Sequence, residues 1–259
     1  MQKAIWNGTE VIALDAIGNT AFKNELKAAG KNNRLFCPHT GCTSPHLILK
    51  CGEIRIPHFA HKLPYDCTYS LAYKKTPKRI KIIRNSIYNI LKEKGHIVSI
   101  DNEIIKDHLT LLTCETENKI IAIEIFDKKA ILDNICRIAY EYADKGIEMA
   151  WIFVTNDGPT CINPLYFIRN YPIDLSNSTF FLTDKYGEAV IQYSFKDHLN
   201  VLQKIDDISN INIENNSLNL ENFQNNHNNI SFDDLAEELS SMMKEKNYKN
   251  IYRGNWIFG

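Results

Sequence analysis

The chain has 259 residues, of which 44% are hydrophobic and 24% are charged, and it contains only 11 glycines and 8 prolines. This composition excludes a fibrous or largely disordered protein, and the length allows one large domain or two small ones. No apolar run approaches the roughly 18 residues of a membrane span. Residues 1–20 lack the basic start and apolar core of a signal peptide. We therefore expect a cytoplasmic protein with no membrane association.

The formal net charge of −1 hides an uneven distribution of charge along the chain. Residues 23–94 contain 15 Lys and Arg against 4 Asp and Glu, whereas residues 95–259 contain 14 basic against 25 acidic residues. A basic segment joined to an acidic remainder indicates an anionic partner, such as nucleic acid, at one end of the molecule. The alternative is that the lysines only form solvated faces.

The first expected element is a hairpin. Ala4–Trp6 and Val11–Leu14 flank the pair Asn7-Gly8, which is a strong hairpin signal between apolar runs. A region rich in Cys and His follows, and then Thr76 and Pro77 introduce a helix, with Thr76 as its N-cap and Pro77 at the first helical position. We expect this helix to bury one apolar stripe and to end at a glycine; these residues are Ile80, Ile83, Ile87, Ile90, Leu91 and Gly95.

The middle of the chain predicts a mixed α/β domain. Extended segments are expected at residues 97–100, 104–114 and 119–126, followed by a helix over residues 131–145 and a buried strand over residues 149–154. Together with the preceding helix, the predicted order is helix, strand, strand, strand, helix, strand.

The last third of the chain carries weaker signals. Residues 179–182 and 189–193 are suited to a further hairpin. Residues 208–230 are rich in Asn with few apolar anchors, which indicates a linker or a long loop. Residues 231–259 combine an acidic helix with an apolar tail that ends in Trp256-Ile257-Phe258, and this tail is a candidate contact for a protein partner.

Residues 37–67 concentrate four thiols and four imidazoles, and such clustering in a reducing compartment indicates metal binding before disulfide formation. Three sulfurs and one imidazole complete a tetrahedral zinc site, which leaves no open position for chemistry, so the zinc would be structural. Our preferred ligands are Cys37, Cys42, His61 and Cys67, with His58 as the alternative to His61. The competing interpretation is a set of buried free cysteines with scattered surface histidines.

Three short motifs resemble the N-terminal zinc module of CoiA-like competence proteins. They are Leu35-Phe36-Cys37-Pro38 up to Cys42, Leu49-Lys50-Cys51-Gly52, and Ile56-Pro57-His58-Phe59-Ala60-His61. In that family the module precedes a nuclease domain of the PD-(D/E)XK type, which has a restriction-endonuclease-like fold. The resemblance continues downstream. The family has an Asp on one strand and an Ile-Glu-x-Gln motif on a later strand, and these correspond to Asp107 and Glu124. A helix with Arg and Tyr and then a strand with Trp-Ile follow in the family, and these correspond to Arg137 with Tyr140 and to Trp151-Ile152. The predicted order of elements is also the core order of that nuclease fold.

The two acids have a geometry that can be worked out from the expected hairpin. If residues 115–118 form the loop, Cys114 lies opposite Lys119, and Asp107 and Glu124 become diagonal neighbours on one side, roughly 7 to 8 Å apart. Two carboxylates at that spacing can bind one Mg²⁺ or Mn²⁺, which activates a water and offsets charge on the scissile phosphate. A one-residue slip would separate them. The alternative for each acid is an ordinary surface carboxylate.

The sequence also departs from the family pattern. Phe126 stands where the motif has Lys or Gln, and Lys128 is the candidate substitute if the strand continues. Basic residues replace the Glu and His that relatives often carry near the first nuclease helix, and such residues suit backbone phosphates rather than metal. The expected nucleic-acid contacts are Lys75, Lys78, Arg79, Lys81 and Arg137.

We therefore expect an α/β chain with four parts. They are a β-hairpin and zinc module (1–75), a restriction-endonuclease-like αβββαβ domain (76–207), an Asn-rich linker or loop (208–230), and a helical C-terminal extension with an apolar tail (231–259). The expected function is that of a metal-dependent DNA endonuclease in DNA processing or in defence against foreign DNA. The alternatives are a cleavage-inactive nuclease-fold subunit that binds DNA and recruits a partner, and a zinc-stabilised protein-interaction module without nucleic acid. Binding that weakens steeply with salt would exclude the last.

Overall fold

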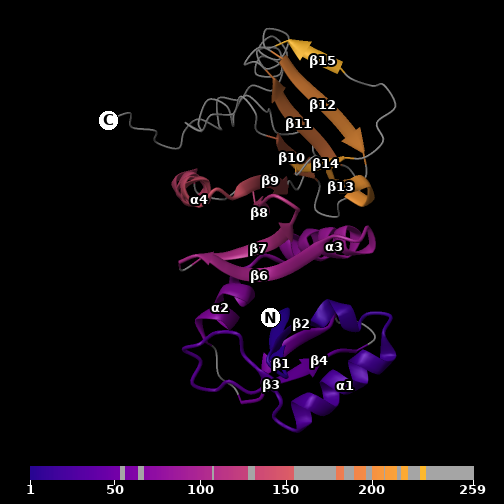
Figure 1. Ribbon diagram of the computed structural model, residues 1–259, viewed down its shortest axis with the longest axis vertical. Helices are drawn as coiled ribbons and strands as arrows, with labels where there is room; N and C mark the ends of the chain where they lie inside the picture. The colour runs from indigo at the N-terminus through magenta and orange to yellow at the C-terminus, as the bar shows by residue number, and fades with distance from the viewer. Residues whose placement is uncertain are drawn as a thin grey trace, which may run out of the picture.

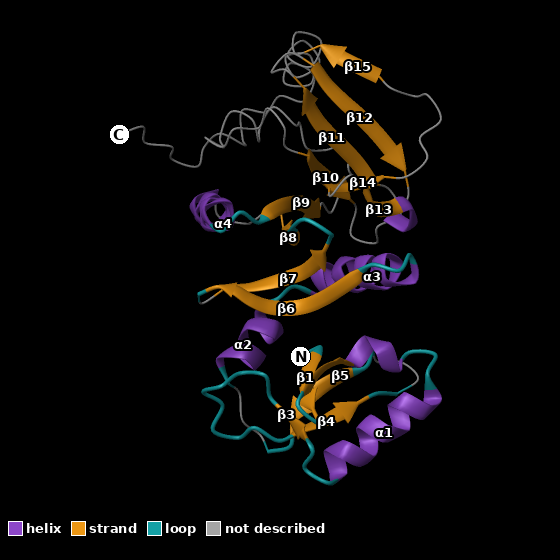
Figure 2. Ribbon diagram, in the orientation of Figure 1, coloured by secondary structure: helices purple, strands orange, loops and turns teal. Residues whose placement is uncertain are grey.

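The structure, a computed structural model, describes residues 1–52, 56–63, 67–106, 108–127, 132–154, 179–183, 190–196, 200–206, 208–214, 217–220 and 228–231. The described part is mixed α/β, as predicted, with four α-helices and four sheets. Figure 1 shows the N-terminal module at one end of the molecule and the last strands of the large sheet at the other. Figure 2 shows how the helices lie against the strands.

The N-terminal module contains two small sheets and one helix. Its elements are β1 (Lys3–Trp6), β2 (Thr9–Ile12), α1 (Thr20–Lys31), β3 (Leu35–Phe36), β4 (Leu47–Lys50) and β5 (His58–His61). The predicted hairpin is confirmed, because β1 pairs with β2 and both Asn7 and Gly8 have the positive φ angles of its turn. The sequence did not predict α1, which packs on β4. A Cβ at Gly30 would lie 3.1 Å from the Cα of Ile48, so a glycine is needed for this close approach.

An eight-stranded mixed sheet is the largest sheet of the described fold, with the order β15-β12-β11-β10-β9-β8-β7-β6. Strand β9 runs parallel to both of its neighbours, β8 and β10, and the remaining pairs are antiparallel. The strands are β6 (Ile97–Ile105), β7 (His108–Glu115), β8 (Ile120–Asp127), β9 (Glu148–Val154), β10 (Thr179–Thr183), β11 (Val190–Lys196), β12 (Asn200–Asp206) and β15 (Asn228–Ser231). The predicted hairpin in the last third is confirmed by β10 and β11, where Leu182 pairs with Ile191.

Helices cover both faces of this sheet. The apolar stripe of α3 (Lys78–Glu93) packs on Ile121, Ile123 and Ile125 of β8, whereas α4 (Leu132–Asp144) packs on Ala122 of the same strand. Because side chains alternate along a strand, Glu124 belongs to the α4 face. The order α3, β6, β7, β8, α4, β9 is the order of elements that the sequence predicted.

Two local predictions at the entry to this domain need correction. Pro77 is the N-cap of α3, and no side chain caps that helix. The hydroxyl of Thr76 instead donates to the carbonyl of Ala72, 3.1 Å away, at the end of α2 (Thr68–Lys75). The end of α3 follows the prediction, because Gly95 has a positive φ and its amide donates to the carbonyl of Lys92.

The predicted register of β7 and β8 is also wrong. Cys114 pairs with Ile121, not with Lys119, and Glu115 pairs with Ile120. The loop is Thr116 to Lys119, because the amide and hydroxyl of Thr116 both donate to the carbonyl of Lys119, and the Lys119 amide returns a bond to that hydroxyl. The side chain of Thr116 therefore closes a turn that sequence spacing alone placed one residue earlier.

The expectation of a linker or loop over residues 208–230 is wrong for much of that segment. It contains a short 3-10 helix, η4 (Ile208–Asn210), and a hairpin of β13 (Ile211–Glu214) and β14 (Ser217–Leu220). The side chains of Ile211, Leu218 and Leu220 are buried in the cluster that α3 also joins. The predicted acidic helix and apolar tail after Ser231 lie outside the described residues.

Within the described residues, we find no helix with both the length and the apolar character needed to cross a membrane.

Candidate functional site

Three cysteines and one histidine of the N-terminal module converge on one point. The Sγ atoms of Cys37, Cys42 and Cys67 and a ring nitrogen of His61 all lie within 4.8 Å of one another. Cys37 follows β3, His61 is the last residue of β5, and Cys67 is the N-cap residue of α2, so three elements supply these ligands. They are the four preferred residues of the sequence analysis.

The distances in this cluster fit a tetrahedral zinc site. Cys37 Sγ lies 3.7 Å from Cys67 Sγ, and His61 Nε2 lies 3.4 Å from Cys67 Sγ. Around a zinc ion with ordinary bond lengths, two sulfurs are about 3.8 Å apart, and a sulfur and a nitrogen are about 3.5 Å apart. His61 Nδ1 is 2.7 Å from the carbonyl oxygen of Ser44, which fixes the ring and leaves Nε2 for the ion.

The alternative ligand His58 is not part of the cluster, since its Nδ1 lies 3.0 Å from the carbonyl oxygen of Ile56. Burial, and then the neighbouring Cys67, raise the pKa of the Cys37 thiol well above its ordinary value. A thiolate at this position therefore needs a cation beside it, and zinc supplies one. The donor set, its spacing and its burial thus suit a structural zinc ion.

Glu124 lies at the centre of the second candidate site. Its side chain is only 2% exposed, and its Oε1 accepts hydrogen bonds from the hydroxyl of Tyr142 (2.6 Å) and from Nε2 of His108 (2.7 Å). The Tyr142 hydroxyl also contacts the hydroxyl of Thr110. Burial, and then the charge of Glu124, raise the pKa of Tyr142 far above its ordinary value, so the phenol stays a donor. Glu124 is therefore a buried carboxylate that is held in one position.

The structure does not describe the two residues that were expected to act with Glu124. Asp107 and Lys128 both lie outside the described residues. Phe126 is 9% exposed, and its ring packs against those of Trp151 and Phe153, with centroids 6.3 and 5.5 Å away. Phe126, which stands where the motif has Lys or Gln, is thus part of an aromatic cluster.

The α4 residues that the resemblance singled out lie on the outside of that helix. Arg137 forms an ion pair with Glu141, one turn along α4, and about half of its side chain is exposed. Tyr140 is 54% exposed.

Sequence reasoning missed His108, Thr110 and Tyr142. His108 is the first residue of β7, and Thr110 follows at the strand period of two, so both belong on one face of that strand. From these two polar residues, a polar site on this face of β7 could have been predicted. Tyr142 gave no comparable signal, because its contact with Glu124 joins elements that are 18 residues apart.

A basic face follows the end of α2 and the start of α3. Lys75 and Lys78 are exposed, and Arg79 and Lys81 are partly buried. Nζ of Lys81 lies 4.4 Å from the centroid of the Tyr73 ring. Burial, and then the charge of Arg84, lower the pKa of Lys81. No acidic residue lies in the first turn of α3.

A cavity of about 410 Å³ lies next to this face, between β5 and α2. Its lining combines basic side chains with an aromatic ring and apolar groups, among them Lys50, His58, Leu63, Tyr73 and Lys74. Such a lining suits a phosphate together with a stacked base.

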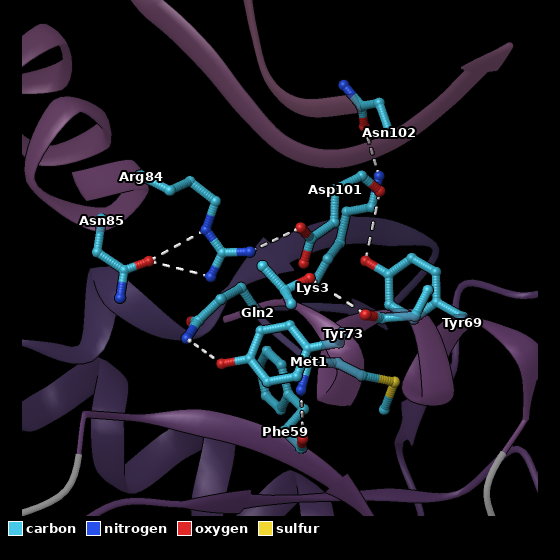
Figure 3. A network of polar contacts seen from close by, with 12 residues as sticks. Met1, Gln2, Lys3, Phe59, Tyr69, Tyr73, Arg84, Asn85, Asp101 and Asn102 are labelled. Carbon is cyan, nitrogen blue, oxygen red and sulfur yellow. Dashed lines mark hydrogen bonds and ion pairs between the residues drawn. The ribbon is translucent and has the colours of Figure 1, made fainter. Parts of the chain in front are cut away.

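Polar contacts fix the N-terminal module on the large sheet (Figure 3). Arg84 of α3 is fully buried, and its Nη1 lies 2.8 Å from Oδ1 of Asp101, which is 3% exposed. The hydroxyl of Tyr69 on α2 donates to the carbonyl of Asp101, and Nζ of Lys3 on β1 donates to Oδ1 of Asn102 (2.6 Å). The zinc cluster and the sheet are therefore joined through buried groups.

Part of the N-terminal module matches a known family. Residues 19–70 match the family model of the competence protein CoiA, N-terminal domain. The match covers about a fifth of the chain and includes α1, β3, β4, β5 and all four residues of the Cys and His cluster. It supports a relationship to the CoiA family, which is linked to competence. No curated protein and no solved structure matches the chain.

Proposed function

We propose that this protein acts on nucleic acid, with a zinc-stabilised CoiA-type module joined to a restriction-endonuclease-like core that hydrolyses phosphodiester bonds in DNA. The observation that carries the proposal is Glu124. It is a buried, hydrogen-bonded carboxylate on the third strand of an α-β-β-β-α-β arrangement. An acid in such a place is costly unless it has a task or a charged partner.

The proposed chemistry needs a divalent ion, Mg²⁺ or Mn²⁺, at Glu124. Such an ion lowers the pKa of a bound water and offsets the charge that builds on the phosphate. Glu124 would hold the ion, and Tyr142 keeps its carboxylate in one orientation through the 2.6 Å hydrogen bond. Asp107 is the proposed second acid and Lys128 the proposed phosphate contact. Both now rest on the family resemblance alone, because the observed register of β7 and β8 removes the hairpin geometry that made Asp107 a diagonal neighbour of Glu124.

The basic face supports DNA as the substrate. Lys75 and Lys78 are exposed beside a cavity that Tyr73 and Lys74 also line, and phosphate contacts of this kind position a strand without reading its sequence. The biological setting that we propose is DNA processing, as in competence, or defence against foreign DNA.

The test is a cleavage assay on single-stranded and double-stranded DNA and on RNA, with Mg²⁺, with Mn²⁺ and with a chelator. We expect Glu124→Gln to lower cleavage at least a hundredfold while DNA binding is unchanged. The matched control is Glu141→Gln, which removes an exposed acid on α4 that pairs only with Arg137 among the described residues. Cleavage that Glu124→Gln retains, or that continues in the chelator, would refute the assignment.

A second candidate function is DNA binding without cleavage, and Phe126 favours it. A phenyl ring can neither position water nor hold phosphate, and this one is packed between Trp151 and Phe153. In that case the wild type binds DNA with an affinity that falls steeply as salt rises, yet leaves every substrate intact with either ion. Such a subunit would recruit a partner, for which the C-terminal tail is our candidate. Binding that does not depend on salt would instead favour a zinc-stabilised protein-interaction module.

The basic face has its own test. Replacing both Lys75 and Lys78 by Ala should weaken DNA binding and reduce its dependence on salt. The control replaces Lys23 and Lys27 on α1 of the N-terminal module, which do not line the cavity.

A further inference from the structure

We propose that His108 is a direct ligand of the ion at Glu124, and that the site therefore prefers a divalent first-row transition ion to Mg²⁺. This inference deepens the proposed function, since it concerns the same ion. It is tested by ion binding rather than by cleavage, so the two can fail separately.

The two donor atoms are placed as neighbouring ligands of one ion. His108 Nε2 and Glu124 Oε1 lie 2.7 Å apart. In an octahedral site with bonds near 2.1 Å, adjacent ligand atoms are about 3.0 Å apart. An ion can thus replace the proton between these atoms after a movement of only a few tenths of an ångström.

The chemistry of the pair decides which ion fits. Imidazole nitrogen suits transition ions, whereas Mg²⁺ selects oxygen ligands and keeps several waters. Affinity for a site with nitrogen and oxygen donors rises along the first row from Mn²⁺ to Cu²⁺. A site built only from the two predicted acids would favour Mg²⁺, and His108 changes this preference.

The surroundings support a bound ion rather than a simple ion pair. Glu124 is 2% exposed and His108 is 20% exposed, so the pair opens to solvent on the imidazole side, where an ion with its waters can enter. Tyr142 donates to the same oxygen of Glu124, Oε1, and contacts Thr110. Hydrogen-bonded support of this kind is typical of the carboxylates that bind metals.

The experiment measures Mn²⁺ binding to the full chain after its zinc site has been filled. Mn²⁺ is paramagnetic, so pulsed electron paramagnetic resonance detects a directly bound ¹⁴N nucleus. We expect one bound Mn²⁺ with nitrogen modulation in the wild type. His108→Asn should remove the modulation and weaken Mn²⁺ binding on the order of tenfold or more.

His96→Asn is the matched control. His96 is also partly buried and its Nε2 lies 2.6 Å from a side-chain oxygen, that of Asn212. This variant should leave the signal and the affinity unchanged. His108→Asp, which restores an all-oxygen donor set, should lower the ratio of Mn²⁺ to Mg²⁺ affinity relative to the wild type.

Each outcome separates the two proposals. Nitrogen-coordinated Mn²⁺ in a protein that cleaves nothing would support this inference and refute the nuclease proposal. Cleavage that Glu124→Gln abolishes and His108→Asn leaves intact would do the reverse. If the wild type binds no Mn²⁺, or binds it without nitrogen modulation, His108 is only the ion-pair partner of Glu124 and the inference is wrong.

Discussion

The buried ion pair between Arg84 and Asp101 joins α3 to β6, directly beside the contacts that hold the N-terminal module, and it allows a direct test of what fixes this part of the fold. Arg84→Met keeps most of the side-chain volume and removes the charge. The change deletes the 2.8 Å contact to Asp101 and two hydrogen bonds to Oδ1 of Asn85. Oδ2 of Asp101 is buried and has no hydrogen-bond partner among the described residues. After the change, neither oxygen of the Asp101 carboxylate would have a hydrogen bond to a described residue.

The expected cost follows from that isolation. Removing one partner of a buried pair destabilises a protein by about 3–5 kcal/mol, because the remaining charge stays in a medium of low polarity. For a chain of this size such a loss lowers the melting temperature by roughly 10 °C. Urea and thermal unfolding of the zinc-loaded protein measure it.

Two further variants make the reasoning refutable. Arg137→Met breaks an exposed pair on α4 and should cost no more than about 0.5 kcal/mol. The double variant Arg84→Met with Asp101→Asn should lose about 1–3 kcal/mol less than the sum of the two single changes, since neither charge then remains. Asn tolerates the left-handed backbone of residue 101, which has φ 54. If Arg84→Met costs as little as Arg137→Met, or if the single changes add, the pair does not hold α3 on β6.

Three other expectations concern the thiols and the buried phenol. Cys42→Ser should abolish zinc binding and unfold the module, whereas the control Cys51→Ser should retain one zinc per chain. Elemental analysis measures the zinc content and circular dichroism measures the folding. Equal zinc contents in the two variants would contradict the ligand assignment. Burial raises the pKa of the Cys114 thiol to about 11, so this cysteine should resist iodoacetamide at pH 8 in the folded protein and react in urea, as followed by mass spectrometry. Burial also raises the pKa of Tyr142 above that of the unfolded chain, near 10, so its contribution to stability is complete below pH 10 and is lost as the pH rises further. Tyr142→Phe should therefore be less stable than the wild type at pH 8 by about 1–2 kcal/mol. Between pH 10 and 11 the variant should lose less stability than the wild type. Equal losses of stability in the two proteins over this pH range would contradict the prediction.

The sequence was most informative where chemistry is local. The ligands Cys37, Cys42, His61 and Cys67 were predicted because few residue types bind zinc and all four lie within one short segment. Helix ends at glycines and the Asn-Gly turn were predicted for the same reason, since the backbone conformation of a few residues decides them.

Prediction failed where distant or small interactions decide the structure. The register of β7 and β8 depends on the hydroxyl of Thr116, and a shift of the loop by one residue moved every pair of the hairpin. The hairpin of β13 and β14 was missed because the many asparagines of this segment favoured a loop, although its apolar and polar residues alternate as in a half-buried strand. Ile211, Leu218 and Leu220 are buried in the cluster that α3 also joins. The contact of His108 with Glu124 depends in turn on where β7 begins.

Cys67 links the zinc cluster to the large sheet within three residues. It supplies one sulfur of the cluster and is also the N-cap residue of α2, whose Tyr69 donates to the carbonyl of Asp101. Oxidation of the thiols would therefore release the start of that helix and, through the tyrosine, loosen the outermost strand of the sheet. Amide exchange along β6 in peroxide-treated protein would measure that loosening.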